Sequence, residues 1–113
     1  MNINIRPAQK TDCARIMELV RELATYERAP EQVTVSFDHF VESGFGNNPV
    51  WWAYVAEVDE KVEAFALYYI RYSTWKGQIM YLEDILVTEK LRGHGIGKLL
   101  FDKLLEEARS KGL

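Results

Sequence analysis

The chain has 113 residues, a formal net charge of −3 and a single cysteine. Its 48% hydrophobic and 12% aromatic residues are typical of a globular protein, so we expect one domain with a packed core over residues 1–113. The acidic balance argues against nucleic acid as the main partner, and a lone cysteine excludes an intrachain disulfide or a thiolate-rich zinc site. No apolar run reaches the roughly 20 residues that cross a bilayer, and we expect a cytoplasmic protein without a metal site.

The first predicted elements are a short strand and a helix. Residues 3–6 alternate apolar and polar side chains, which indicates a strand, and Pro7 ends it because proline cannot donate to a β-ladder. Thr11 is the expected N-cap of the helix. Ala29-Pro30 bounds this helix, whose apolar face is marked by residues at helical spacing: Ile16, Leu19, Val20, Leu23 and Ala24.

A second helix and three strands follow. Ser36 is suited to cap a short helix, which the turn residues 44–49 interrupt. Dense β-branched and aromatic side chains then indicate strands over residues 50–58, 62–72 and 78–87. The short turns between them predict antiparallel pairing.

The last predicted element is a helix over residues 97–111. Gly112 suits the left-handed position after it, and its apolar face is expected at Phe101, Leu104, Leu105 and Ala108. The order β-α-α-β-β-β-α predicts an α+β fold with a mixed, largely antiparallel sheet flanked by helices. A helix that follows a sheet usually leads back into it, so we expect the fold to be truncated before its later strands.

Charge is unevenly distributed along the chain. Residues 26–63 contain eight acidic and two basic side chains, whereas residues 84–113 contain five acidic and six basic ones. An acidic stretch is usually a solvated face, and the alternative is a surface that attracts a cationic ligand.

A glycine-rich loop joins the last strand to the last helix. Gly93, Gly95 and Gly97 leave room for a ligand near the backbone N–H groups, and a helix N-terminus favours anions. The spacing fits neither a Walker loop, because no Ser or Thr follows Lys98, nor the dinucleotide fingerprint, whose third glycine falls one place early. Residues 92–97 therefore predict a phosphate-binding loop of the form Arg-x-x-Gly-x-Gly, with a flexible turn as the alternative.

Two adjacent carboxylates, Glu83 and Asp84, lie inside an apolar strand. Strand side chains alternate between faces, so one carboxylate is expected to point toward the buried side unless the backbone bulges. A desolvated carboxylate has a raised pKa and attracts cations, so it can bind a protonated amine and take its proton. The alternative is a structural pair that caps a loop or lies on an exposed face.

Segments along essentially the whole chain match one family pattern, together with loop 92–97: Ile5-Arg6-Pro7-Ala8, Asp12-Cys13, Glu22-Leu23-Ala24-Thr25-Tyr26-Glu27, Tyr68-Tyr69, Tyr72-Ser73-Thr74-Trp75-Lys76-Gly77 and Tyr81-Leu82-Glu83-Asp84-Ile85. On these segments the sequence resembles the GCN5-related N-acetyltransferase (GNAT) superfamily, closest to its diamine (spermidine/spermine) N-acetyltransferase branch. The resemblance implies transfer of acetyl from acetyl-CoA to a primary amine of a small polyamine, diamine or lysine-like amino acid, by direct attack on the thioester.

The resemblance also implies residue roles. Glu83 is the expected catalytic base, and Tyr26, Glu27, Trp75 and Asp84 are expected to join it in binding the amine. The expected contacts of acetyl-CoA are Ile85, Leu86, Val87, Arg92, Gly93, His94, Gly95, Ile96, Gly97 and Lys98. The implied partners are a small cationic amine and a second copy of the chain in a homodimer.

Members of the superfamily continue beyond the glycine-loop helix with another strand, a helix and one or two final strands. The next strand forms one wall of the cofactor groove, and a tyrosine beyond it is the usual general acid. We therefore expect this chain to be an N-terminal part of the fold, or to complete its sheet with a second chain. A non-catalytic acyl-CoA-binding module, a protein N-terminal acetyltransferase and a plain interaction domain are the alternative functions.

Overall fold

A computed structural model describes all 113 residues of the chain. Its helices and strands are β1 (Ile3–Pro7), α1 (Cys13–Tyr26), α2 (Phe37–Phe45), β2 (Trp52–Val58), β3 (Lys61–Ser73), β4 (Gly77–Val87) and α3 (Ile96–Ser110). Three short 3-10 helices lie in the connections: η1 (Lys10–Asp12), η2 (Pro30–Gln32) and η3 (Glu89–Leu91). The predicted element order and the α+β class are confirmed.

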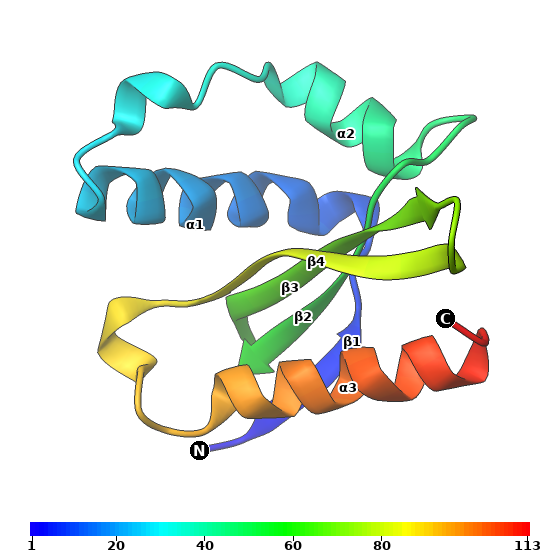
Figure 1. The fold of residues 1–113 in the computed structure, drawn as a ribbon. Helices are drawn as coiled ribbons and strands as arrows, with labels where there is room; N and C mark the ends of the chain where they lie inside the picture. The colour runs from blue at the N-terminus through cyan, green and yellow to red at the C-terminus, as the bar shows by residue number, and fades with distance from the viewer.

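The four strands form one sheet in the order β1-β2-β3-β4, and every neighbouring pair is antiparallel. Helices α1 and α2 lie on one face of this sheet and α3 on the other (Figure 1). Strand β4 stands at an edge, so one side of its backbone has no neighbouring strand. No helix combines the length and the apolar character that crossing a membrane requires.

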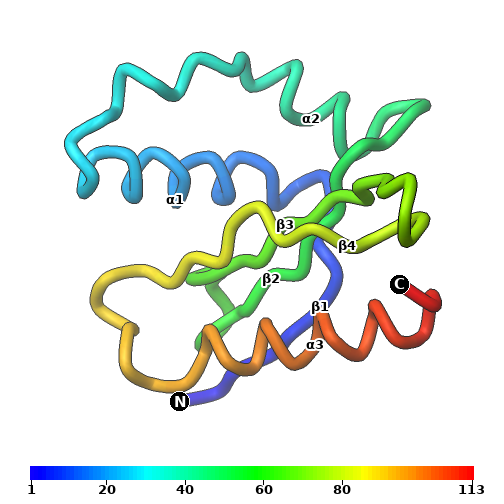
Figure 2. Tube along the Cα trace, in the orientation of Figure 1, coloured from blue at the N-terminus to red at the C-terminus, as the bar shows by residue number.

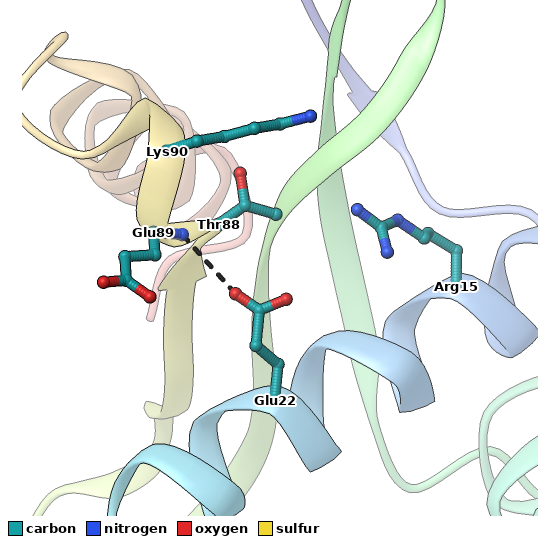
Figure 3. Close-up of a pocket in the computed structure, with 5 residues that line it drawn as sticks. All are labelled: Arg15, Glu22, Thr88, Glu89 and Lys90. Atoms are coloured by element: carbon teal, nitrogen blue, oxygen red, sulfur yellow. Dashed lines mark hydrogen bonds between the residues drawn. The ribbon is translucent and has the colours of Figure 1, made fainter.

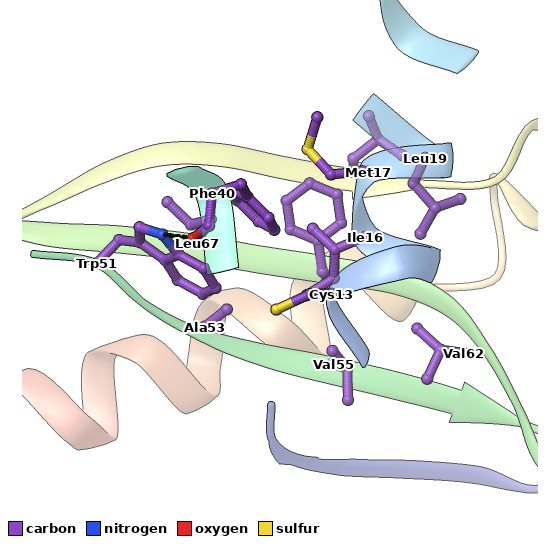
Figure 4. Close-up of a cluster of buried hydrophobic side chains, with 12 residues drawn as sticks. Cys13, Ile16, Met17, Leu19, Phe40, Trp51, Ala53, Val55, Val62 and Leu67 are labelled. Carbon is purple, nitrogen blue, oxygen red and sulfur yellow. Dashed lines mark hydrogen bonds between the residues drawn. The ribbon is translucent and has the colours of Figure 1, made fainter. Parts of the chain in front are cut away.

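The larger core lies between the sheet and helices α1 and α2 (Figure 4). Trp51 stacks on Phe40 with 4.6 Å between ring centroids, and its indole Nε1 donates to the carbonyl of Phe40 at 3.1 Å. This contact fixes α2 to the start of β2. The remaining core members are Cys13, Ile16, Met17, Leu19, Ala53, Val55, Val62, Phe65, Leu67 and Leu86.

The smaller core lies under α3. Ile96, Leu100 and Leu104 recur every four residues and are buried against strand residues that include the small Ala56, Ala64 and Ala66. Of the apolar face predicted for this helix, Leu104 is confirmed, but Phe101 and Leu105 are exposed. The prediction was wrong for Phe101 and Leu105 because the apolar residues of α3 form two overlapping helical stripes that share Leu104, and only contact with the sheet selects one.

The helix ends agree with the sequence in part. The Ser36 hydroxyl accepts from the His39 N–H at 3.1 Å, and Gly112 has a φ of +70°, as predicted. The prediction for Thr11 was wrong: it lies within η1, and Asp12 precedes the first residue of α1. The Asp12 carboxylate accepts from the Gln9 N–H at 2.7 Å and from Arg6, which adds a short 3-10 turn before the α-helix.

Candidate active site

The glycine loop connects η3 to α3. Gly93 and Gly95 have φ angles of +85° and +79°, in the left-handed region that disfavours side chains. No heavy atom lies within 4 Å of the position that a Cβ would take at either residue. The backbone conformation, and not crowding, therefore requires glycine here, and the outer surface of the loop is open.

Backbone donors are concentrated in this loop. The N–H groups of residues 93–98 make no hydrogen bond to any other group of the chain, and the first backbone bond of α3 is from the Leu99 N–H to the Gly95 carbonyl at 3.1 Å. Six consecutive unpaired donors at a helix N-terminus favour an anionic ligand, because the helix dipole adds partial positive charge. The residues present therefore fit a diphosphate.

The side chains predicted to contact the cofactor divide into two groups. Leu86 and Ile96 are buried in the two cores, so only their backbone groups are available to a ligand. Arg92 and His94 are exposed, and Lys98 is exposed but paired with Asp102 at 2.8 Å. The loop thus offers mainly backbone donors, supplemented by the Arg92 guanidinium.

Arg92 links the loop to the end of α1. Its Nε donates to the carbonyl of Val87 at 3.1 Å, and its guanidinium carbon lies 5.4 Å from the centre of the Tyr26 ring. The structure therefore brings Tyr26, predicted for the amine site, beside a residue predicted for the cofactor. Figures 1 and 2 show the end of α1 and the loop after β4 on the same side of the molecule.

A β-bulge separates the two acidic residues of β4. Leu82 pairs with Tyr68 and Asp84 pairs with Leu67, so Glu83 has no partner in β3. The bulge reverses the alternation of faces. Leu82 packs on the α3 side of the sheet. Asp84 is paired with Leu67, which packs on the side of α1 and α2, so Asp84 lies on that side too. The sequence allowed for a bulge at the carboxylate pair, and the structure contains one.

Asp84 is the more buried member of the pair. Burial raises its pKa above the ordinary value, and the nearby negative charges of Glu83 and Glu27 raise it further. Glu83 is exposed. The desolvation that the sequence argument assigned to Glu83 therefore falls on Asp84, and Glu27 at the end of α1 joins the two as an acidic cluster (Glu27, Glu83 and Asp84).

Trp75 lies apart from this cluster. It is 93% exposed in the turn between β3 and β4, where Ser73 pairs with Gly77. Glu83 is six strand residues beyond Gly77, a separation of about 20 Å at the usual rise per residue. The turn is at the opposite end of β4 from the glycine loop (Figure 2). This chain therefore does not bring Trp75 to the acidic cluster, contrary to its predicted position as a wall of the amine site.

A polar pocket next to the loop contains residues that the sequence reasoning missed. It lies between α1 and η3 and is lined by Arg15, Glu22, Thr88, Glu89 and Lys90 (Figure 3). The Glu22 carboxylate accepts from the Glu89 N–H at 3.4 Å. Lys90 also reaches Glu63, a buried acid inside an apolar strand. The sequence already contained a signal for this site, because Glu63 is a charged residue within an apolar strand.

Known proteins match this chain over nearly its whole length. The pattern of the Acetyltransferase (GNAT) family matches residues 13–113. The bovine thialysine N-epsilon-acetyltransferase is 42% identical over 97% of the chain and 69% of that protein. The human spermidine/spermine N(1)-acetyltransferase-like protein 1 is 34% identical over 92% of the chain and 16% of that protein.

Solved structures agree on the fold. A possible acetyltransferase from Clostridium difficile 630 superimposes with a TM-score of 0.76 at 23% identity, covering 96% of this chain and 72% of the other. The aminoglycoside N-acetyltransferase AAC(6')-Iy, solved in complex with CoA, gives a TM-score of 0.75 at 21% identity, covering 98% and 72%.

Proposed function

The chain belongs to the acetyltransferase (GNAT) family and is an N-acetyltransferase, and we propose that it transfers acetyl from acetyl-CoA to a primary amine of a small diamine, polyamine or lysine-like amino acid. One observation carries the proposal. The end of α1 contacts the glycine loop, where Tyr26 lies beside Arg92, and it also contributes Glu27 to the acidic cluster.

The loop is the proposed site for the diphosphate of acetyl-CoA. Six unpaired N–H groups and the Arg92 guanidinium match the charge and the acceptor atoms of a diphosphate. Ile85, Leu86 and Val87 lead from the acidic cluster to this loop, so β4 is the proposed path of the pantetheine arm. When bound, acetyl-CoA supplies the activated acetyl group as a thioester.

The acidic cluster is the proposed amine site. An alkyl ammonium with a pKa near 10.4 is protonated at neutral pH and cannot attack a carbonyl carbon. Glu83 is the proposed base because the bulge frees it from the strand ladder and leaves it exposed next to Asp84. Glu27 and Asp84 would hold the positive charge in place. The names of the thialysine and spermidine/spermine relatives support this class of acceptor.

The proposed chemistry balances without another reagent. Glu83 takes one proton from the ammonium, directly or through a water, and the freed nitrogen lone pair forms a bond to the acetyl carbonyl carbon. The carbon–sulfur bond then breaks, and the leaving thiolate of CoA takes up the second proton that the nitrogen loses, which gives the amide and the CoA thiol. Backbone N–H groups of β4 near the bulge are the proposed donors to the negative charge that develops on the carbonyl oxygen.

Calorimetry and a thiol-release assay test this function. Wild-type protein should bind CoA, and it should release CoA thiol from acetyl-CoA with diamines, polyamines or thialysine. Glu83→Gln should lower kcat by roughly 10²–10⁴-fold, the usual contribution of a general base, with little change in the Kd for CoA. Absence of CoA binding by the wild-type chain would overturn the proposal.

A matched control separates a base from a general charge effect. Glu106→Gln removes one exposed carboxylate from α3, outside the proposed site, and should leave kcat unchanged. Equal losses of kcat and CoA affinity in Glu83→Gln would instead make Glu83 a structural residue.

We also propose a homodimer. The unpaired edge of β4 supports it, because an exposed strand edge is a template for pairing with another chain. Light scattering should give a particle of twice the 13.1 kDa chain mass, and a monomer would exclude it.

A further inference from the structure

Glu63 is a buried carboxylate that the proposed chemistry does not use. It is 4% exposed, near the start of β3. In the ladder with β2, Val62 pairs with Glu57 and Ala64 pairs with Ala56, so Glu63 is the extra residue of a bulge. Burial of a carboxylate is costly unless the charge is paired, and a reason for its retention is therefore needed.

Three cations from different segments surround this carboxylate. Its Oε1 lies 2.7 Å from Nη2 of Arg15 in α1 and 4.0 Å from Nζ of Lys61, and its Oε2 lies 3.0 Å from Nζ of Lys90 in η3. Burial raises the pKa of Glu63, but hydrogen bonds from Lys90 and Arg15 outweigh burial and leave its pKa below the ordinary value. The group is therefore an anion that joins α1, β3 and η3.

The segment that Glu63 holds has little structure of its own. η3 is a single 3-10 turn, closed by hydrogen bonds from Leu91 to Thr88 at 3.0 Å and from Arg92 to Glu89 at 3.3 Å. Its position against the rest of the fold depends on the Lys90–Glu63 pair, on the Thr88 N–H bonded to the Glu63 carbonyl at 3.0 Å, and on the Glu22–Glu89 contact. Figure 3 shows Lys90 and Arg15 extending toward each other across this region.

The glycine loop begins immediately after this turn. Arg92, the first loop residue, follows Lys90 by two positions, and residues 92–95 belong to no helix or strand. A backbone anion site binds well only when its N–H groups already point at a common centre, because ordering them at the moment of binding weakens the affinity. The geometry of the six donors thus depends on how firmly η3 is held.

We infer that Glu63 is a positioning residue: its buried carboxylate holds η3 against β3 and α1 through Lys90 and Arg15, and so keeps the glycine loop ordered for the diphosphate. The inference rests on the proposed function in one respect, that the ligand of the loop is the cofactor. The ordering of the ligand-free loop does not depend on that assignment.

Glu63→Gln tests the inference because glutamine keeps the size of the side chain and removes the charge. In the ligand-free protein, amide hydrogen exchange of residues 92–98 should become about fivefold faster. The Kd for CoA should rise about fivefold, the factor expected for one partly exposed ion pair. The KM for the amine and kcat should change by less than about twofold, a division that general destabilisation would not produce.

Two further variants keep the test decisive. Lys90→Met alters only an exposed side chain, so it is usable even if Glu63→Gln folds poorly. It should raise the Kd for CoA by a similar factor, and the double variant should bind CoA no more weakly than Glu63→Gln alone, because that variant already removes the pair with Lys90. Additive losses would instead mean that Lys90 contacts the phosphates directly, and would overturn the inference.

Glu57→Gln is the matched control. Glu57 pairs with Arg6 of β1 at 2.7 Å and forms no ion pair with η3, so the variant should leave CoA affinity and loop exchange unchanged. Equal effects of Glu57→Gln and Glu63→Gln would overturn the inference. So would a Glu63→Gln variant whose CoA affinity and amide exchange rates equal those of the wild type. If the wild-type chain binds no CoA, the proposed function fails, and the exchange data alone decide whether Glu63 orders the loop.

Discussion

Asp84 pairs with Leu67 in the β3–β4 ladder, whereas its neighbour Glu83 is skipped by the ladder. After this unpaired residue, the side chains of β4 point to the opposite faces of the sheet from those that regular alternation would give. Asp84 therefore faces α1 and approaches Glu27. The proposed amine site depends on this bulge, because without it Asp84 would point toward α3.

The raised pKa of Asp84 predicts a pH-dependent stability penalty. A carboxyl group whose pKa is raised on folding binds a proton more tightly in the folded than in the unfolded chain, so stability falls as the pH rises from the ordinary value of 3.8 through the raised one. Asp84→Asn should therefore increase the free energy of unfolding at pH 7 by about 0.5–1 kcal/mol, allowing for solvent screening. Urea unfolding at several pH values measures this effect.

The same variant supplies its own control. The gain should disappear below pH 3.8, where the Asp84 carboxyl is protonated in both states. A gain that is independent of pH would mean that the amide packs better, and that the carboxylate is not strained by burial. Activity at pH 7 should fall, because the ionised Asp84 is proposed to hold the positive charge of the amine, and a group placed for binding commonly costs stability.

Gly95 and Gly77 form a matched pair for the phosphate loop. Their φ angles are +79° and +82°, and neither has a neighbour within 4 Å of a Cβ position. Alanine should destabilise the fold by about 1 kcal/mol at each site, because both conformations are left-handed. Only Gly95→Ala should also weaken CoA binding in calorimetry, because only Gly95 belongs to the donor array.

Gly77→Ala is thus the reference for backbone strain alone. If both variants lost CoA affinity equally, the effect would be one of folding and not of the loop.

Gly44 lies against the Trp51 ring. A Cβ at this position would overlap ring atoms of Trp51, which is held by stacking on Phe40 and by an edge contact with Phe45. Gly44→Ala should therefore destabilise the fold by about 1–3 kcal/mol through overpacking. Thermal unfolding followed by near-UV circular dichroism should show a lower Tm and a changed tryptophan signal. A Tm equal to that of the wild type would show that α2 can move away from β2.

Arg6 joins β1 to two carboxylates. It contacts Asp12 at 2.8 Å and Glu57 at 2.7 Å. Burial raises the pKa of Asp12, but the hydrogen bonds from Arg6 and Gln9 outweigh it, and the hydrogen bond from Arg6 lowers the pKa of Glu57. A lowered pKa contributes stability that is present above the ordinary values of 3.8 and 4.5 and is lost as the pH falls through the lowered ones.

Arg6→Met should remove this contribution. Loss of the Asp12 pair should lower the free energy of unfolding at pH 7 by about 1–2 kcal/mol. The difference from wild type should shrink as the pH falls from the ordinary pKa values of 4.5 and 3.8 through the lowered ones, because the carboxyls of the folded wild type then become protonated as well. Tm measured from pH 2.5 to 7 checks this, and a constant difference would assign the effect to lost packing of the arginine stem.

Local patterns in the sequence determined most of the fold. The strands 62–72 and 78–87, the Ser36 cap and the left-handed Gly112 follow from side-chain periodicity and backbone preference, which act over a few residues. The glycine loop was predictable for the same reason, since its chemistry lies in its own N–H groups and in the helix that follows it.

Only the tertiary structure decided how the carboxylates are used. The burial of Asp84 and the exposure of Glu83 depend on a bulge, and the role inferred for Glu63 depends on a second bulge and on cations from distant segments. The register of a ladder is set by all of its pairs together, so a charged residue in an apolar strand indicates that a bulge is possible but does not determine which residue is skipped. Trp75 is near the acidic pair in sequence, but the extended strand between them places it at the far end of β4.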